Sequence, residues 1–390
     1  DIPVLFRVLK KCVGDKGKNW KKNAKEKRGL LREREDQSMY SSARTVPLRA
    51  AGAVERTLRR RRGGGRGRRR RRRTPTPRTA LTSSAVSRAA ASADDDDEVY
   101  RVMSRNQELS VIAVRATKLV SEAQRRHRAA PTATAAIGRN VIASLLLGAF
   151  KGDEETVQIT FKGDGPLGQL TAVSDNLGNT KCLVGNAKAD PPLRPDGKLN
   201  VGMAIGKGVL SVSRSHPSWV QPYNGQVDIY TGEIAEDVAV YMRDSEQTNS
   251  AISVGVQLDR ELTVIGAGGY MVQVLPFASD ETLDYLEKHI PTLDSPSTMV
   301  ESGLSAEEIA KKILGELGAF KEVETRLTPK YGPCSRTELE GRMLKAIASL
   351  GREEAMKIIQ EDGKIEVTCE FCNEVLVFNE ADIEKALREI

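Results

Sequence analysis

The chain has few of the residues that mark several common protein classes. Among 390 residues there are five cysteines, three histidines and only 4% aromatic residues. Five cysteines in a chain of this length do not make the disulfide scaffold of a small secreted domain. No apolar run approaches the roughly 18 residues that a membrane span requires, so we expect no membrane partner. These absences leave a soluble chain of two or three domains as the expected class.

Acidic residues are scarce around one long arginine run. Residues 1–97 contain 28 Lys and Arg against 11 Asp and Glu, a balance of +17, whereas residues 98–390 contain 32 against 42, a balance of −10. The two add up to the net charge of +7. The low-complexity run Arg59–Arg73 and its Ser- and Ala-rich surroundings predict an organelle transit peptide or disordered leader over residues 1–97. A chloroplast is the expected destination, with the mitochondrion as the alternative.

The remainder has the pattern of an α+β protein. Apolar residues recur at three- and four-residue spacing from Leu109 to Ala123, which predicts a helix, and Pro131 separates it from a second helix over about 132–147. Short β-like runs between residues 155 and 276, divided by Gly, Asn and Asp, then predict antiparallel-rich sheets. Residues 279–328 are predicted to be helical and more polar. Residues 329–390 form a small unit of helices with two strands around a C-x-x-C sequence.

Two glycine-rich sequences resemble nucleotide-binding loops, but neither is followed by the helix that such a loop requires. The sequence GDGPLG at 163–168 fits G-x-G-x-x-G, but a dinucleotide site needs a helix after the loop. A strand-like run follows instead, so we expect a turn between strands. The sequence GAGG at 266–269 is followed by YMVQVLP and fails in the same way. The histidines at 127, 216 and 289 have no second ligand at metal spacing and are expected to be ordinary core or surface residues.

The C-terminal cysteines are the strongest chemical signal. Cys369 and Cys372 form the C-x-x-C sequence between two strand-like runs, and Cys334 opens the same small unit. A turn of this kind can present two thiolates to a tetrahedral metal. A thioredoxin-like oxidoreductase instead needs a helix after the motif, and CEFCNEVLVF continues into a strand. A redox pair and a metal site both stay open, while Cys182 is expected to be a buried structural thiol and Cys12 lies in the predicted leader.

Several longer segments occur in an order that is specific to one family. From about Tyr100 to the C-terminus the chain resembles the heat-shock protein 33 family, the redox-regulated holdase chaperones of bacteria and plastids. The resemblance implies no enzyme activity and an ATP-independent chaperone whose partners are unfolded or misfolding proteins. It also implies a client-binding domain over 98–278, a linker over 279–328 and a redox-switch domain over 329–390. It rests on HRAAPTATAAIGR (127–139), GDGPLG (163–168), YNGQVDIYTGEIAEDVAVYMRDSEQ (223–247), GAGGYMVQVLP (266–276), CSRTELE (334–340) and GKIEVTCEFCNEVLVF (363–378).

The resemblance also assigns roles to the cysteines and shows one departure. The family has C-x-C, about thirty residues, then C-x-x-C, and its four thiolates bind zinc in the reduced, inactive form. Cys334, Cys369 and Cys372 match, but the first position is occupied by Gly332, which has no side chain. The resemblance therefore implies a Cys369–Cys372 disulfide on oxidation and a weak three-ligand zinc site. It further implies some activity in the reduced state and a homodimer in the oxidised state.

Two other functions remain as alternatives. One is a thiol–disulfide oxidoreductase that uses the C-x-x-C sequence. The other is a zinc-ribbon protein that binds nucleic acid through the arginine run. The balance of −10 over residues 98–390 speaks against a nucleic-acid partner for the folded part, because the phosphate backbone attracts cationic surfaces. We expect no catalytic residue and no nucleic-acid partner.

Overall fold

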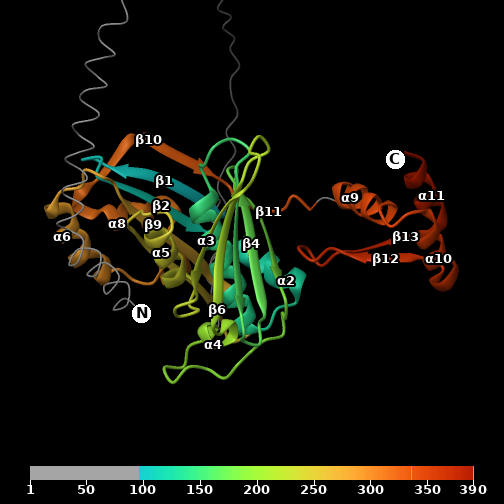
Figure 1. Cartoon of the computed structure of the whole chain (residues 1–390). Coiled ribbons are helices and arrows are strands. Elements are labelled where there is room, and N and C mark those ends of the chain that lie inside the picture. Colours follow the sequence, from blue (N-terminus) through green and yellow to red (C-terminus); the bar gives the residue numbers. More distant parts are fainter. Residues whose placement is uncertain (1–95, 335, 390) are drawn as a thin grey trace, which may run out of the picture. The chain divides into compact units, whose positions relative to one another are not determined.

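The computed structural model describes residues 96–334 and 336–389, which form two large sheets, a small hairpin and the helices around them (Figure 1). The predicted leader, apart from its last two residues, lies outside these ranges. The first sheet has the order β10-β1-β2-β9-β8 and is antiparallel throughout. It comprises β1 (Glu98–Ser104), β2 (Leu109–Arg115), β8 (Ser250–Leu258), β9 (Val264–Val274) and β10 (Ala319–Leu327).

The second sheet has six strands in the order β11-β5-β4-β3-β6-β7. Only β11 and β5 run parallel, and the other neighbours are antiparallel. The sheet comprises β3 (Thr156–Gly163), β4 (Gln169–Asp175), β5 (Asn179–Val184), β6 (Gly208–Ser215), β7 (Tyr223–Asp228) and β11 (Lys330–Tyr331). The antiparallel-rich α+β class predicted from the sequence is confirmed.

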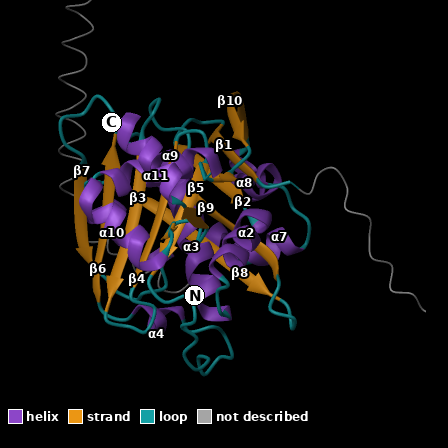
Figure 2. Ribbon diagram, turned by 90° about the vertical axis from the view of Figure 1, so that its right-hand side faces the viewer, coloured by secondary structure: helices purple, strands orange, loops and turns teal. Residues whose placement is uncertain are grey.

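A long buried helix connects the two large sheets. Helix α3 (Pro131–Gly148) is apolar on nearly every side, begins with a proline at its first position, and contacts strands of both sheets. Helix α2 (Thr117–His127) lies beside it (Figure 2). Ile137, Val141 and Leu145 are fully buried and share one hydrophobic core with strands of the two sheets. The second predicted helix, over about 132–147, is therefore confirmed.

The first predicted helix is wrong over its first half. Residues 109–115 form strand β2, and all seven are buried. The apolar spacing fits a helix by coincidence, because a central strand that is covered on both faces is apolar at every position. The β-branched residues Val111, Ile112 and Val114 favour the strand. Helix α2 starts only at Thr117, where the side chain of Asp97 accepts hydrogen bonds from the backbone of Lys118 and Leu119.

Three short helices cover the other face of the five-stranded sheet. They are α6 (Asp280–His289), α7 (Pro296–Glu301) and α8 (Ala306–Leu314), and they share a second core with β1, β2 and β9. Ser305 and Glu308 form a capping box at the start of α8, with the Glu308 N–H donating to Ser305 Oγ over 3.2 Å. The prediction of helix throughout 279–328 is wrong at its end. Gly315 and Gly318 adopt positive φ angles, and the chain then enters the sheet as β10.

The last part of the chain forms a small unit with its own core. It contains α9 (Arg336–Ala348), α10 (Arg352–Asp362), the hairpin of β12 (Ile365–Thr368) and β13 (Val375–Phe378), and α11 (Glu380–Glu389). Leu339, Ile359 and Leu376 are among the few side chains that make up this core. Two further helices, α4 (Val201–Ile205) and α5 (Ala235–Asp244), belong to the larger part. Within residues 96–334 and 336–389, no helix is long and apolar enough to cross a membrane.

The glycine-rich sequences serve packing and turns. Residues 164–168 connect β3 to β4, which confirms the predicted turn between strands. A Cβ atom at Gly163 would lie 1.9 Å from the carbonyl oxygen of Ile205, so the loop can pack against the end of α4 only without side chains. Likewise GAGG lies inside β9, where a Cβ atom at Gly266 would meet the carbonyl oxygen of Ser297 at 2.4 Å. The glycines of the GAGG sequence let α7 lie directly on the sheet.

We predict that Gly266→Val lowers the free energy of unfolding by about 1–3 kcal/mol, because the added side chain must push α7 away from β9. Urea unfolding followed by circular dichroism measures this. Gly341→Ala is the control: a Cβ atom at Gly341 in α9 has open space around it, and alanine favours a helix by up to about 1 kcal/mol. Equal stability of Gly266→Val and the wild type would contradict the packing role of this glycine.

Candidate redox site

The C-x-x-C sequence forms the turn of the β12–β13 hairpin. Thr368 pairs with Val375, and the six residues between them close through backbone hydrogen bonds. The Cys369 N–H donates to the Glu374 carbonyl over 2.9 Å, and the Asn373 N–H donates to the Cys369 carbonyl over 2.7 Å. Asn373 has a φ of 58°, a conformation that asparagine tolerates better than most residues. The turn therefore holds both cysteines at one end of a rigid hairpin.

The two cysteines of this turn differ in their exposure to solvent. Both are free, Cys372 is buried, and Cys369 is partly exposed. Burial raises the pKa of Cys372, a backbone N–H from Glu374 opposes the shift, and a hydrogen bond with Cys369 adds to it. The Cys372 thiol is therefore protonated at neutral pH, and the turn places it three residues from Cys369. The structure thus brings together the two residues that the sequence predicts as the redox pair.

The third predicted ligand, Cys334, lies against the same small hydrophobic core as Cys369 and Cys372. Among the described residues, no group of three or more His, Cys, Asp and Glu side chains is arranged to hold a metal ion. Gly332 has a φ of 146°, which a residue with a side chain rarely adopts. The thiols present therefore do not fit a four-thiolate zinc site, and the three-ligand site stays a prediction.

Tyr331 connects this turn to the larger part of the protein. Its hydroxyl donates to the carbonyl of Phe371, one of the two residues between the cysteines. The same oxygen lies 3.3 Å from His127 Nε2 on α2 and 3.5 Å from the Cys182 backbone nitrogen on β5. Burial lowers the pKa of His127, so this imidazole is neutral at physiological pH. A single hydroxyl group therefore joins the redox turn, a helix and the six-stranded sheet.

Further contacts surround this hydroxyl. The guanidinium of Arg126 lies 4.9 Å from the centre of the Tyr331 ring, and Lys181 Nζ lies 5.0 Å from the centre of the Phe371 ring. These distances suit cation–π attraction. The Asn373 side chain also donates to the Arg126 carbonyl over 3.2 Å. We call Arg126, His127, Lys181, Tyr331 and Phe371 the docking contact.

Sequence reasoning missed the docking contact. His127 was expected to be an ordinary histidine, and its buried position agrees with that, but its partner lies 204 residues away. The available signal was that Tyr331 and Phe371 are aromatic residues beside the cysteines in a chain with 4% aromatics. Cys182 is buried as expected, and burial raises its pKa to about 12.

Comparison with known proteins decides the family. The Hsp33 protein family model matches residues 97–379, most of the chain. The chain belongs to the Hsp33 family. The 33 kDa chaperonin of Desulforamulus reducens is 36% identical over 290 residues, covering 74% of this chain and 97% of that protein. The 33 kDa chaperonin of Bacillus subtilis is 34% identical over 285 residues, covering 73% and 96%.

A solved structure supports the same assignment. The 33 kDa chaperonin of Thermotoga maritima, a heat shock protein 33 homologue, matches with a TM-score of 0.67 and 30% identity. The match covers 75% of this chain and 98% of that one. The chain is therefore an Hsp33-family redox-regulated holdase chaperone that binds unfolded proteins, and it is not an enzyme. The oxidoreductase alternative is set aside, and strand β13 after Cys372 agrees with this.

We predict that Tyr331→Phe loosens the docking contact without unfolding the rest. Loss of the hydroxyl removes the hydrogen bond to Phe371, which contributes a net stabilisation of about 1 kcal/mol. It also leaves His127 and the Cys182 backbone N–H without this partner. Hydrogen exchange should speed up several-fold in β12, β13 and the connecting turn, but not in α3. Tyr285→Phe is the matched control, because its hydroxyl accepts from Glu316 in the larger part. Unchanged exchange in the hairpin of Tyr331→Phe would show that the hydroxyl does not hold it.

Proposed function

We propose that this chain is an ATP-independent holdase that is activated when Cys369 and Cys372 form a disulfide. The supporting observation is the hairpin turn between β12 and β13, which holds both free cysteines three residues apart. In the reaction the two thiols lose two protons and two electrons to hydrogen peroxide. One S–S bond forms, the O–O bond breaks, and two water molecules leave, so atoms and electrons balance.

The docking contact gives this oxidation a way to affect the rest of the protein. Phe371 lies between the two cysteines, so closing the disulfide changes the turn that presents its carbonyl to Tyr331. Loss of that bond weakens the attachment of the small C-terminal unit. A unit with such a small core has little stability of its own and is the first part to open.

Opening would then spread into residues 279–328. Helices α6 to α8 cover the apolar face of the five-stranded sheet, and β10 forms the edge of that sheet beside β1. Ile309 and Ile313 of α8 are fully buried in that core, as are Leu109 and Val111 of β2. Detachment of the helices would expose this face to unfolded clients. We propose that the oxidised protein binds clients there and forms a homodimer.

Hsp33-family proteins bind zinc, and we propose that this chain binds it weakly. Cys334, Cys369 and Cys372 are the only family positions that carry a thiol, and Gly332 leaves the fourth position without a ligand. Because metal binding contributes folding free energy to small cysteine-rich units, weak binding implies a looser reduced state. Some chaperone activity before oxidation follows from this.

We predict that the reduced protein contains less than one zinc per chain, that a chelator removes it, and that the protein suppresses client aggregation measurably without oxidant. Elemental analysis and light scattering measure these quantities. Gly332→Cys should increase zinc retention and lower reduced-state activity, once the local backbone has adjusted from its φ of 146°. Cys334→Ser, the control, should lose zinc further but still form the Cys369–Cys372 disulfide. Stoichiometric, chelator-resistant zinc in an inactive reduced wild type contradicts the proposal.

We also propose that the leader within residues 1–97 directs the chain to the chloroplast and is then removed by a cut before Asp97. The support is the arginine-, serine- and alanine-rich composition, which is typical of transit peptides. The folded part begins close by, because Asp97 accepts hydrogen bonds from the first turn of α2.

We therefore predict that isolated chloroplasts import the full chain and cut it before Asp97. Mass spectrometry of the imported product identifies its first residue. Import and cutting by mitochondria alone would favour the alternative destination. Recovery of the uncut chain from both organelles would contradict the leader.

A further inference from the structure

Strand β7 is an open edge with little of the usual protection, and its one charged residue is Asp228. It is the last strand of the six-stranded sheet, beyond β6 (Figure 2). It pairs with β6 over six residues without a register shift, and most of its residues are exposed. Its sequence, YNGQVD, has no lysine, arginine or proline. Natural sheets normally blunt such an edge with charges, bulges or cover, because an open edge pairs with other chains.

The other edges of the two large sheets are protected. Strand β10 carries Lys321, Glu322, Glu324 and Arg326 and has a register shift against β1. Strand β8 packs against α5 and α7 and has a register shift near its end, whereas β7 also packs against α5 but has no register shift. Strand β11 is only two residues long. Strand β7 is therefore the long edge strand of these two sheets that has no register shift.

The backbone groups that β7 offers to a partner follow from its register. The Ile229 N–H donates to the Gly208 carbonyl directly opposite it. Antiparallel strands alternate between residues that bond to the neighbour and residues that face away. Asn224, Gln226 and Asp228 therefore direct their N–H and C=O groups away from β6. An extended chain of about six residues, roughly 20 Å long, can pair with them.

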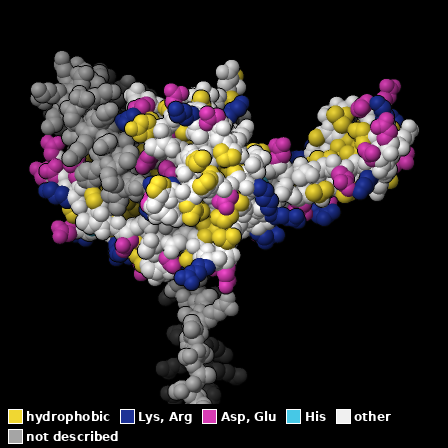
Figure 3. All heavy atoms as spheres, turned by 90° about the horizontal axis from the view of Figure 1, so that it is seen from below, with side chains coloured by type: hydrophobic (Ala, Val, Ile, Leu, Met, Phe, Trp, Pro, Cys, Tyr) yellow, Lys and Arg dark blue, Asp and Glu magenta, His cyan; other side chains and the backbone are white. Residues whose placement is uncertain are grey.

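Exposed apolar side chains flank both ends of this edge. Before β7, the connection from β6 carries Trp219 and Val220, the latter 99% exposed, and β7 itself begins with Tyr223. After β7 come Tyr230, which is 71% exposed, and nearby Met203 of α4, which is 54% exposed. Figure 3, which looks from the side on which α4 lies in Figure 1, shows hydrophobic side chains gathered on the face toward the viewer.

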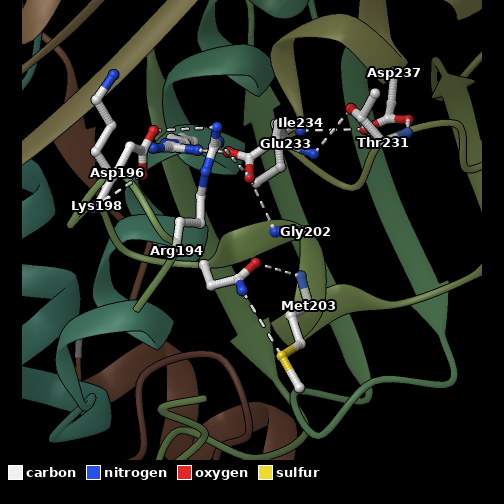
Figure 4. Close-up of polar contacts among 11 residues, drawn as sticks. Arg194, Asp196, Lys198, Gly202, Met203, Thr231, Glu233, Ile234 and Asp237 are labelled. Carbon is white, nitrogen blue, oxygen red and sulfur yellow. Dashed lines mark hydrogen bonds and ion pairs between the residues drawn. The ribbon is translucent and has the colours of Figure 1, made fainter. Parts of the chain in front are cut away.

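The apolar end after β7 is held rigidly. Asp237 accepts from the backbone N–H groups of Tyr230 and Thr231, over 2.7 and 2.9 Å. Glu233 accepts from the Gly202 N–H over 3.2 Å, which ties α4 to the same loop (Figure 4). Arg194 and Arg139 both pair with Glu233. These contacts hold the backbone next to the exposed side chains of Tyr230 and Met203.

We propose that β7 binds an extended segment of an unfolded client by strand addition, with main-chain hydrogen bonds along the edge and apolar client side chains at its two ends. Main-chain pairing requires no particular sequence, which suits a chaperone with many clients. An unfolded polypeptide supplies the unpaired N–H and C=O groups that this edge lacks. This site is present before oxidation and is separate from the face covered by α6 to α8. The inference rests on the family's client-binding function.

The test uses the full chain and reduced, carboxymethylated α-lactalbumin as a permanently unfolded probe. Gln226→Pro removes an N–H that points away from β6, so it blocks client pairing without breaking the existing ladder. We expect Gln226→Pro to weaken probe binding about tenfold, because main-chain hydrogen bonds are lost and the proline ring keeps the client strand away from β7. Gln226→Ala keeps the N–H and should bind as the wild type does. Thermal unfolding checks that both variants fold.

A second measurement needs no substitution. Added probe should slow hydrogen exchange at Asn224, Gln226 and Asp228 of the wild type. Absence of this protection, or wild-type binding by a folded Gln226→Pro, overturns the proposal while leaving the holdase function intact. If Gln226→Pro changes only the self-association of the chain, β7 is an interface between copies and the proposal is wrong. Failure of the wild type, oxidised or reduced, to bind the probe would instead contradict the chaperone function.

Discussion

The burial of helix α3 between the two large sheets is the constraint on which the rest of the structure depends. Nearly all of its 18 residues are buried, so the sheets can pack only where this helix holds them. Its position determines where β5 meets the redox turn and where the opposite edge, β7, reaches solvent. The chaperone part is therefore a rigid frame, and the two regions for which we propose a function, the docking contact beside β11 and β5 and the edge of β7, lie toward opposite edges of one sheet.

The C-terminal unit contrasts with this frame. Its core is small, its two cysteines lie in a hairpin turn, and the docking contact holds it to the larger part through a few polar and cation–π interactions. Such contacts are individually weak, and a change in the turn affects several of them together. A unit of this kind can respond to oxidation while the frame stays folded. The proposed absence of a fourth zinc ligand at Gly332 would remove one further constraint from the same unit.

The two surfaces proposed to bind clients differ in their physical character. The face under α6 to α8 is apolar and covered, so its exposure requires a conformational change. The edge of β7 is polar along its backbone and apolar at its ends, and it needs no such change. A chaperone that retains some reduced-state activity would need an accessible surface of the second kind. The two surfaces therefore complement the proposed weak metal site.

The sequence by itself determined the features that depend on neighbouring residues. The α+β class, the hairpin around Cys369 and Cys372, the capping box of Ser305 and the absence of a nucleotide loop at 163–168 all follow from local patterns. Only the tertiary structure decided that 109–115 is a strand, because burial on both faces hides the period of two. The same holds for β10, for the Tyr331 hydroxyl that joins residues 127, 182 and 371, and for the free edge of β7. These features arise from contacts between residues far apart in the chain, which the local periodicity of the sequence does not predict.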